Sequence, residues 1–311
     1  MLLLMAASPT FAQNYPTKPI RVLVPFSAGS ATDILIRAIG PKLHEAWGQQ
    51  VVADNRPSAG GTVAGSIVAG AAPDGYTLMI TSSAFAGSAA LYDKLPYDTV
   101  RDFAGITQVA STPLIIVVAP SLGLKSLKEL IALARQKPKQ LNFASSGIGS
   151  GTHYGAELFN FTAGISGTHV PYKGVPEAMN DTISGRTQYF VAPTLAAIPL
   201  VKNGRLQALA VTPAQRIAQL PDVPTVAEAA LPGFEYNGWY GFVAPAKTPR
   251  AIIQKFNAEV TRILDAAEMR DRLTAQGAVV RTSTPEAFEK LIRDEIVTRR
   301  KIFQAAGARA N

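Results

Sequence analysis

The chain has 311 residues, enough for two medium-sized α/β units or one large one, and 47% of them are hydrophobic against 17% charged. It contains no cysteine, which excludes a disulfide framework, a thiolate zinc site and a cysteine nucleophile. The formal net charge of +8 indicates a solvated basic surface, with weak attraction of anions as the alternative, and no basic groove lined with aromatic residues indicates a nucleic-acid partner.

The first twelve residues have the pattern of a secretory signal peptide. An apolar run is followed by Thr10-Phe11-Ala12, with small residues at the first and third positions of the triplet. We therefore expect cleavage after Ala12 and a protein of the periplasm. No Lys or Arg precedes the apolar run, so a start further upstream and a buried N-terminal helix are the alternatives. No later stretch has the length and apolar character of a membrane-spanning helix.

The first third of the chain predicts alternating strands and helices from its hydrophobic periodicity. A loop of small residues, 27–31, joins the first strand to the first helix, which Thr32 or Asp33 can cap. A glycine-rich turn at 58–61 precedes the second helix. In chain order we expect a strand at 20–25, a helix at about 32–43, a strand at 50–54, a helix at about 62–71 and a strand at 77–81.

The middle of the chain repeats this order. A second glycine-rich loop, 145–152, again follows a strand and precedes a helix. Two stretches with the same plan predict an α/β fold with two lobes, each built on a mostly parallel sheet. The expected elements are a strand at 141–144, a helix at about 153–163, a strand at 169–172, a helix at 176–184 and a strand at 188–192.

Two further apolar strands, at about 114–119 and 241–245, are expected to cross between the lobes. Two crossings return the chain to the lobe in which it began. We therefore assign residues 13–113 and 239–311 to lobe 1 and residues 114–238 to lobe 2. The apolar spacing of the tail predicts helices at 249–267, 268–276 and 285–305.

Both glycine-rich loops have the composition of an anion-binding site. Each lies where unpaired backbone N–H groups and the positive end of a helix dipole converge, so it can bind an anion without arginine or lysine. Ligands of open α/β sheets bind at the carboxyl ends of strands, where both loops fall. The alternative is that each loop only makes a tight turn. The candidate ligand-binding residues are Phe26, Ser27, Ala28, Gly29, Ser30, Ala31, Thr32 and Asp33 in the first segment and Ser146, Gly147, Ile148, Gly149, Ser150, Gly151, Thr152 and His153 in the second.

Aromatic residues are expected near the same cleft, with core packing as the alternative for each. They are Phe26, Phe85, Tyr172, Trp239 and Tyr240. Lys173, directly after a strand of the second lobe, can reach an anion there or extend into solvent.

Patterns for catalysis, cofactors and metals are weak. The three histidines are scattered without the spacing of metal ligands, and no G-x-S-x-G motif is present. Gly147-Ile148-Gly149 matches part of a dinucleotide fingerprint, but Thr152 replaces its third glycine. We therefore expect a binding protein, with no cofactor and no metal. An α/β hydrolase with a triad assembled from distant segments is the enzyme alternative.

A set of short motifs along the chain carries a family resemblance. They are YPTKPI at 15–20, DNRP at 54–57, APDGY at 72–76, LPYD at 95–98, HVPYKG at 169–174 and LPDVPT at 220–225. Taken together, these motifs resemble the substrate-binding proteins of tripartite tricarboxylate transporters, also called Bug receptors.

The resemblance implies a fold, a function and partners. The fold is an α/β structure of the type II periplasmic-binding-protein class, in which two βαβ lobes joined by two crossing strands close on a ligand. The function is extracytoplasmic capture of a small carboxylate, a dicarboxylate or an aromatic carboxylate, held by backbone N–H groups of the two loops. The partners are a large and a small membrane subunit, and the receptor itself is expected to be a monomer. A membrane sensor kinase is the alternative partner.

The chain departs from the family pattern at positions that face the far end of the ligand. Ala84-Phe85 stands where a Thr-His pair is usual, and Ala192-Pro193 where an Asp-Asn pair is usual. A ligand ammonium group buried there would lack an acidic partner. We therefore expect a ligand with an apolar or aromatic body rather than an acidic amino acid. Ser83, Phe85, Tyr172, Lys173, Ala192, Pro193 and Trp239 complete the candidate ligand-binding residues.

Overall fold

The structure is a computed structural model that describes residues 15–275, 277–305 and 307–308. The expected signal peptide, residues 1–12, lies outside the described residues. In chain order the elements are β1 (Ile20–Val24), α1 (Ala31–Trp47), β2 (Val51–Asn55), the short 3-10 turn η2 (Ala59–Gly61), α2 (Thr62–Ala69), β3 (Thr77–Ser82), α3 (Ala84–Leu91), β4 (Phe103–Val118), η3 (Pro120–Leu122), α4 (Leu127–Gln136), β5 (Asn142–Ser145), α5 (Gly151–Ala163), β6 (Thr168–Pro171), α6 (Val175–Ile183), β7 (Tyr189–Pro193), α7 (Thr194–Lys202), β8 (Gln207–Val211), α8 (Val226–Ala229), β9 (Asn237–Pro245), α9 (Arg250–Asp265), α10 (Ala267–Ala275), β10 (Val279–Val280) and α11 (Pro285–Ala305).

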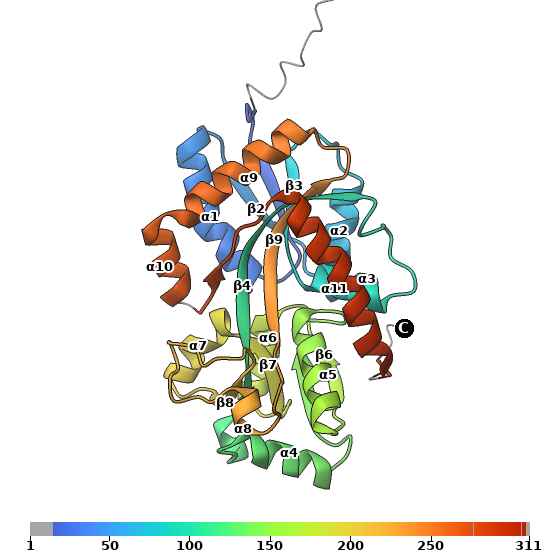
Figure 1. The fold of residues 1–311 in the computed structure, drawn as a ribbon, viewed down its shortest axis with the longest axis vertical. Coiled ribbons are helices and arrows are strands. Elements are labelled where there is room, and N and C mark those ends of the chain that lie inside the picture. The colour runs from blue at the N-terminus through green and yellow to red at the C-terminus, as the bar shows by residue number, and fades with distance from the viewer. Residues whose placement is uncertain (1–14, 276, 306, 309–311) are drawn as a thin grey trace, which may run out of the picture.

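The strands form two parallel groups joined through two long antiparallel strands (Figure 1). β1 pairs in parallel with β2 and β3, and β5 pairs in parallel with β6 and β7. Between these groups β9 and β4 run antiparallel to each other, and each is antiparallel to its outer neighbour, β3 or β7. The structure therefore has the two mostly parallel α/β lobes and the two crossing strands that the sequence predicts.

The crossing strand β4 is longer than the sequence indicates. Its first part pairs with β9 and β10, and its last part pairs with β7 and β8. The apolar run alone is recognisable in the sequence because Thr107, Gln108 and Thr112 interrupt the hydrophobic pattern before it. All three are nevertheless buried. The Thr107 hydroxyl donates to the Ser283 carbonyl and the Gln108 N–H donates to the Ser283 hydroxyl, which satisfies polar groups inside the layer.

Helices cover both faces of each lobe, and four apolar clusters fill the layers between sheet and helix. In the lobe of β1, α1 and α9 pack on one face, and α2 and α11 on the other. In the lobe of β5, α4 and α5 pack on one face, and α6 and α7 on the other. Alternate residues of β7 enter opposite clusters, Tyr189 and Val191 on one side and Phe190 and Ala192 on the other, as the strand period requires.

The last helix, α11, contacts both lobes. Phe288, near its start, packs edge to face on Trp239 with 5.2 Å between ring centroids. Phe303, near its end, packs against Tyr154 and His153 of α5 in the other lobe. Figure 1 shows this helix, in red, descending from the first lobe past α3 toward α5. The C-terminal helix is therefore part of the connection between the lobes.

Two helices begin earlier than the sequence predicts. α1 starts at Ala31, with Ser30 at its N-cap position, and it continues beyond Pro41 to Trp47 instead of ending near residue 43. α5 starts at Gly151, two residues before the expected start. The first turns of both helices therefore include loop residues that the sequence assigns to the anion-binding segments. No helix in the described part of the chain is both long enough and apolar enough to cross a bilayer.

Candidate functional site

A pocket lies where the two lobes meet, next to the starts of α1 and α5. It holds about 400 Å³ of space not filled by atoms, including the part that is open to solvent. Its residues come from both lobes and from both crossing strands. They are Phe26, Ser30, Ala31, Thr32, Ser82, Ser83, Thr112, Leu114, Ser146, Gly151, Thr152, Val175, Pro193, Gly238, Trp239 and Tyr240.

Among the described residues that line this pocket, none carries a charged side chain. Its polar groups are hydroxyls, backbone amides and the indole N–H of Trp239, and its apolar surface includes Phe26, Leu114 and Val175. Burial raises the pKa of Tyr240 above its ordinary value, so this phenol is also neutral at physiological pH. An anion in the pocket would therefore have to be stabilised by neutral donors.

The first amides of two helices are the strongest such donors. Ala31 and Thr32 begin α1, Gly151 and Thr152 begin α5, and all four line the pocket. A helix supplies no acceptor for the N–H groups of its first turn. Ser30 makes no side-chain cap on α1, so that end is left open to another acceptor. Two helix N-termini, one from each lobe, thus point positive dipole ends at one pocket.

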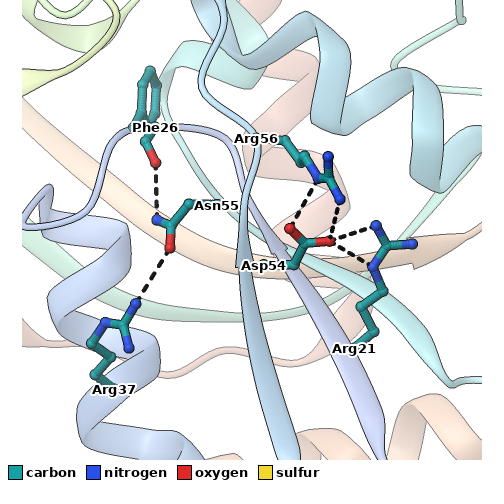
Figure 2. A network of polar contacts seen from close by, with 6 residues as sticks. All are labelled: Arg21, Phe26, Arg37, Asp54, Asn55 and Arg56. Carbon is teal, nitrogen blue, oxygen red and sulfur yellow. Dashed lines mark hydrogen bonds and ion pairs between the residues drawn. The ribbon is translucent and has the colours of Figure 1, made fainter.

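The first loop is braced from behind by β2 (Figure 2). In Figure 2 the Asn55 side-chain amide donates to the Phe26 carbonyl at 3.0 Å, and Arg37 donates to Asn55 Oδ1 at 3.3 Å. The same amide also donates to Asp33 Oδ1 at 3.0 Å. Asp33 Oδ2 accepts from the Gly29 N–H and from Arg37 Nε, both at 2.9 Å. Burial would raise the pKa of Asp33, but these hydrogen bonds lower it below its ordinary value. The charged carboxylate therefore holds the loop in place and is itself fully paired.

A second acidic residue near this loop is neutralised in the same way. Asp54 accepts from Arg21 Nε at 2.8 Å and from Arg56 Nε at 2.9 Å, as Figure 2 shows. Burial would raise the pKa of Asp54, but the two arginines lower it below its ordinary value. Neither Asp33 nor Asp54 therefore presents an unpaired negative charge to an anion in the pocket.

The second loop is held by its own hydroxyls. The Ser146 N–H donates to Thr152 Oγ1 at 2.9 Å, and the Ser150 hydroxyl caps α5 by accepting from the His153 N–H at 3.1 Å. Gly149 donates its N–H to His153 Nδ1 at 3.2 Å. These bonds fix the loop, so that the first amides of α5 are presented by a rigid backbone.

Two stacked histidines lie behind the second loop. The rings of His153 and His169 are 4.0 Å apart and nearly parallel, and Phe143 stacks on His169 at 5.0 Å. Ser145 Oγ and His169 Nε2 share a hydrogen bond of 2.6 Å. Burial and the neighbouring His153 lower the pKa of His169 to about 2, so the ring is neutral at physiological pH. The pair therefore supports the loop rather than the pocket lining.

Comparison with known proteins decides the family. The model of the tripartite tricarboxylate transporter family receptor matches residues 35–308 of this chain. The chain belongs to this family. Its sequence is 35% identical to that of the UPF0065 protein in the tcbD-tcbE intergenic region of Pseudomonas sp. (strain P51), over 99% of this chain and 93% of that protein. It is 33% identical to protein BugT of Bordetella pertussis, over 97% and 94% of the two chains.

Solved structures of similar proteins have the same architecture. R. palustris Rpa4515 with adipate matches with a TM-score of 0.91 and 35% identity, over 94% of this receptor and 98% of that chain. MatC (Rpa3494) from Rhodopseudomonas palustris with bound malate matches with a TM-score of 0.88 and 32% identity, over 93% and 99%. These matches confirm the family resemblance and the two-lobed periplasmic-binding-protein fold expected from the sequence.

Ten of the residues predicted for the receptor's ligand site line the pocket. They are Phe26, Ser30, Ala31, Thr32, Ser83, Ser146, Gly151, Thr152, Pro193 and Trp239. Six of the other predicted loop residues hold the loops in place: Gly29, Asp33, Gly149, Ser150 and His153 make the bonds described above, and Gly147 donates its N–H to Ser145. The remaining three have other surroundings. Ser27 contacts the opposite lobe, Ile148 packs partly against a core cluster, and Ala28 is exposed.

Four further predicted residues lie away from the pocket. The ring of Phe85 packs edge to face on Phe103 at 4.9 Å and near Tyr97 at 6.2 Å, inside a core layer. This placement corrects the expectation that Phe85 faces the ligand, because α3 turns this position toward α11. Ala192 points into the core between β7 and α6, the Tyr172 hydroxyl donates to Asp181 at 2.7 Å, and Lys173 is exposed.

Six lining residues lie outside the predicted ligand set. They are Ser82, Thr112, Leu114, Val175, Gly238 and Tyr240. Four of them belong to β4 and β9, which pass directly between the two helix N-termini. Tyr240 was expected near the cleft as an aromatic residue, and the topology could have indicated the other three, because strands that cross between two binding loops form the floor of the cleft. Val175 begins α6 and carries no signal in the sequence.

Several contacts join the lobes beside the pocket, and two of them bear on closure. Ser27 in the first loop donates its hydroxyl to Glu177 Oε1 of α6 at 2.6 Å. Elsewhere α3 approaches the second loop so closely that a Cβ at Gly87 would lie 1.9 Å from the Gly149 carbonyl oxygen. The two lobes are therefore in contact beside the pocket, and their backbone contact at α3 depends on glycine. The described residues contain no group of three or more side chains able to hold a metal ion.

We expect the receptor to lose stability as the pH falls below about 6.5. The ordinary pKa of a histidine is 6.5, and the pKa of His169 in the folded protein is about 2. Between pH 6.5 and pH 2 the unfolded chain therefore binds a proton at this residue that the folded chain does not bind. The free energy of unfolding therefore falls with acid, by about 2 kcal/mol at pH 5 for this one group. Urea unfolding at pH 7.5 and pH 5 measures the difference. His169→Phe should show a much smaller decrease, and an unchanged pH dependence in that variant would contradict the assignment.

Proposed function

We propose that this receptor captures a small carboxylate in the pocket between its lobes and delivers it to the membrane subunits of a tripartite tricarboxylate-type transporter. The observation that carries the proposal is the convergence of two helix N-termini, from α1 and α5, on a pocket whose lining has no charged side chain. Helix ends with free amides favour anions. A lining without acidic residues does not oppose them.

The ligand that fits best has an apolar body between its polar ends. Leu114, Val175 and Pro193 supply apolar surface, and no acidic side chain among the described lining residues could pair an ammonium group. Relatives bound to adipate and to malate support a dicarboxylate. Because Phe85 lies in the core, an aromatic ligand gains no ring contact from it.

Localisation and lobe boundaries belong to the same proposal. Family membership supports a site in the periplasm, reached through the signal peptide at residues 1–12. The pairing of β1, β2 and β3 supports lobe 1 at 13–113 and 239–311, and the pairing of β5, β6 and β7 supports lobe 2 at 114–238. The receptor acts as a monomer that opens and closes about the two crossing strands.

A ligand panel tests the proposal directly. Adipate and malate should each raise the melting temperature of the receptor, because a ligand at a thousand times its Kd stabilises the folded state by about 4 kcal/mol. Glutamate and aspartate should not, since their ammonium group would be buried without a partner. Calorimetry then gives the Kd of each ligand. If glutamate binds and neither adipate nor malate does, the ligand class proposed for the pocket is wrong.

Replacing Lys173 with alanine should change the Kd for adipate by less than about threefold, because an exposed lysine contributes little to a site that it does not line. Thr152→Val is the matched comparison inside the pocket. It removes a hydroxyl that lies 3.1 Å from Ser146 Oγ and 2.9 Å from Ser150 Oγ, and it should weaken adipate about tenfold. Complete loss of binding in Lys173→Ala would show that a cation holds the ligand.

Gly87→Ala should hold the lobes apart. Its Cβ would lie 1.9 Å from the Gly149 carbonyl oxygen in the closed receptor, so closure and adipate binding should both weaken, the Kd rising at least about tenfold. Gly70→Ala is the control, because its Cβ would meet nothing closer than 3.6 Å. Calorimetry gives the Kd, and small-angle scattering at saturating adipate should show a larger radius of gyration than the wild type. Wild-type affinity together with wild-type compaction would refute closure at this contact.

A further inference from the structure

A buried arginine lies directly behind the pocket. Arg299 on α11 is 1% exposed. Among the Arg, Lys, Asp and Glu residues that the structure describes, only Arg299 and Asp33 are buried. Its guanidinium lies over the Tyr154 ring, 4.2 Å from the centroid. A buried charge is costly unless something makes use of it, and an apolar side chain of similar volume usually packs as well or better. Packing alone therefore does not explain an arginine here.

The guanidinium is connected to the pocket through one hydroxyl. Arg299 Nη2 donates to the Tyr236 hydroxyl at 3.0 Å, and this hydroxyl donates to the Gly151 carbonyl at 3.1 Å. The same oxygen lies 3.5 Å from Ser83 Oγ. Gly151 and Ser83 both line the pocket, one from the start of α5 and the other from the end of β3. The buried charge is therefore two hydrogen-bond steps from the lining of both lobes.

Only part of this charge is compensated. Arg299 Nε is paired with Glu295 one turn earlier on α11, but Nη1 has no hydrogen-bond partner among the described residues. The Glu295 side chain is 24% exposed and the Arg299 side chain 1%. Solvent therefore screens the carboxylate more than it screens the guanidinium. The net field on the Tyr236 side of the pair is positive.

We propose that Arg299 is a positioning residue that supplies the pocket with the positive potential its own lining lacks, through Tyr236. This proposal rests on the proposed carboxylate function. Tyr236 fixes the carbonyl of Gly151, whose amide begins α5, and Arg299 orients and polarises the Tyr236 hydroxyl. An anion at the two helix N-termini then experiences a net positive potential from behind the lining, although no cation touches it.

The sign of the effect distinguishes this role from a structural one. Arg299→Met removes the positive charge and should raise the Kd for adipate roughly tenfold. Glu295→Gln removes the opposing charge and should leave the Kd unchanged or lower it about twofold to threefold. If the pair served only to hold α11 in place, breaking it from either side would weaken binding.

Two further variants separate charge from shape. Arg299→Lys keeps the charge but loses the planar fork and the stacking on Tyr154, so it should keep most of the affinity if charge matters and lose it if packing matters. Tyr236→Phe keeps the ring but removes the hydroxyl that joins Arg299 to Gly151, and it should weaken adipate even if Arg299→Met does not fold. Lys301→Met, an exposed residue on the same helix, is the control for net charge.

Calorimetry with adipate and malate, together with urea unfolding of each variant, gives the result. Weaker binding in Arg299→Met and Tyr236→Phe, with affinity retained in Arg299→Lys, Glu295→Gln and Lys301→Met, supports the proposal. Equal loss in Arg299→Lys and Arg299→Met, weaker binding in Glu295→Gln, or wild-type affinity in Tyr236→Phe overturns it. If the wild-type receptor binds neither dicarboxylate, the carboxylate function itself is wrong and the role of Arg299 falls with it, a result distinct from the others.

Discussion

A carboxylate buried between protein lobes needs donors, and here the donors have to be neutral. The described lining of the pocket has no charged side chain, so the amides at the starts of α1 and α5 are the strongest positive features that it contains. Each helix end carries roughly half an elementary charge, so two ends facing one site amount to about one unit. This charge is about the same as that of one arginine side chain, but it is carried by rigid backbone. The remainder of the fold serves to bring these two helix ends together.

The crossing strands achieve this. β4 and β9 are shared between the lobes, with β3 and β1 on one side and β7 and β5 on the other. Because β1 and β5 each lead into a binding helix, their carboxyl ends face the same gap. The crossing strands then provide its floor through Thr112, Leu114, Gly238 and Tyr240. Glycine at 87 permits the backbone contact that closes the gap at α3. Closure and pocket shape therefore depend on the same few strands.

Local pattern was sufficient to predict the layers and the two loops, because strand alternation, helix periodicity and glycine-rich turns are short-range signals. It was insufficient for the orientation of individual side chains. Phe85 is aromatic and near the cleft in sequence, yet α3 directs it into a core with Phe103. His153 follows a binding loop but stacks on His169. Thr112 and Val175 line the pocket because of pairing and packing between distant segments, which no local pattern encodes. The polar start of β4 was hidden for the same reason, since Ser283 satisfies it from far along the chain.

The charges near the pocket lie one layer behind its lining. Asp33 with Arg37 braces the first loop, and Arg299 with Tyr236 braces the start of α5. A charged lining would have to lose its hydration whenever the lobes closed, which costs several kcal/mol for each ion. Asp33 and Arg299 are instead buried behind the lining. Their hydrogen bonds hold the neutral donors in fixed directions, so little reorganisation is left for the moment of binding. The absence of cations from the lining is therefore compatible with anion binding, because the charge lies behind the neutral donors and holds them in place.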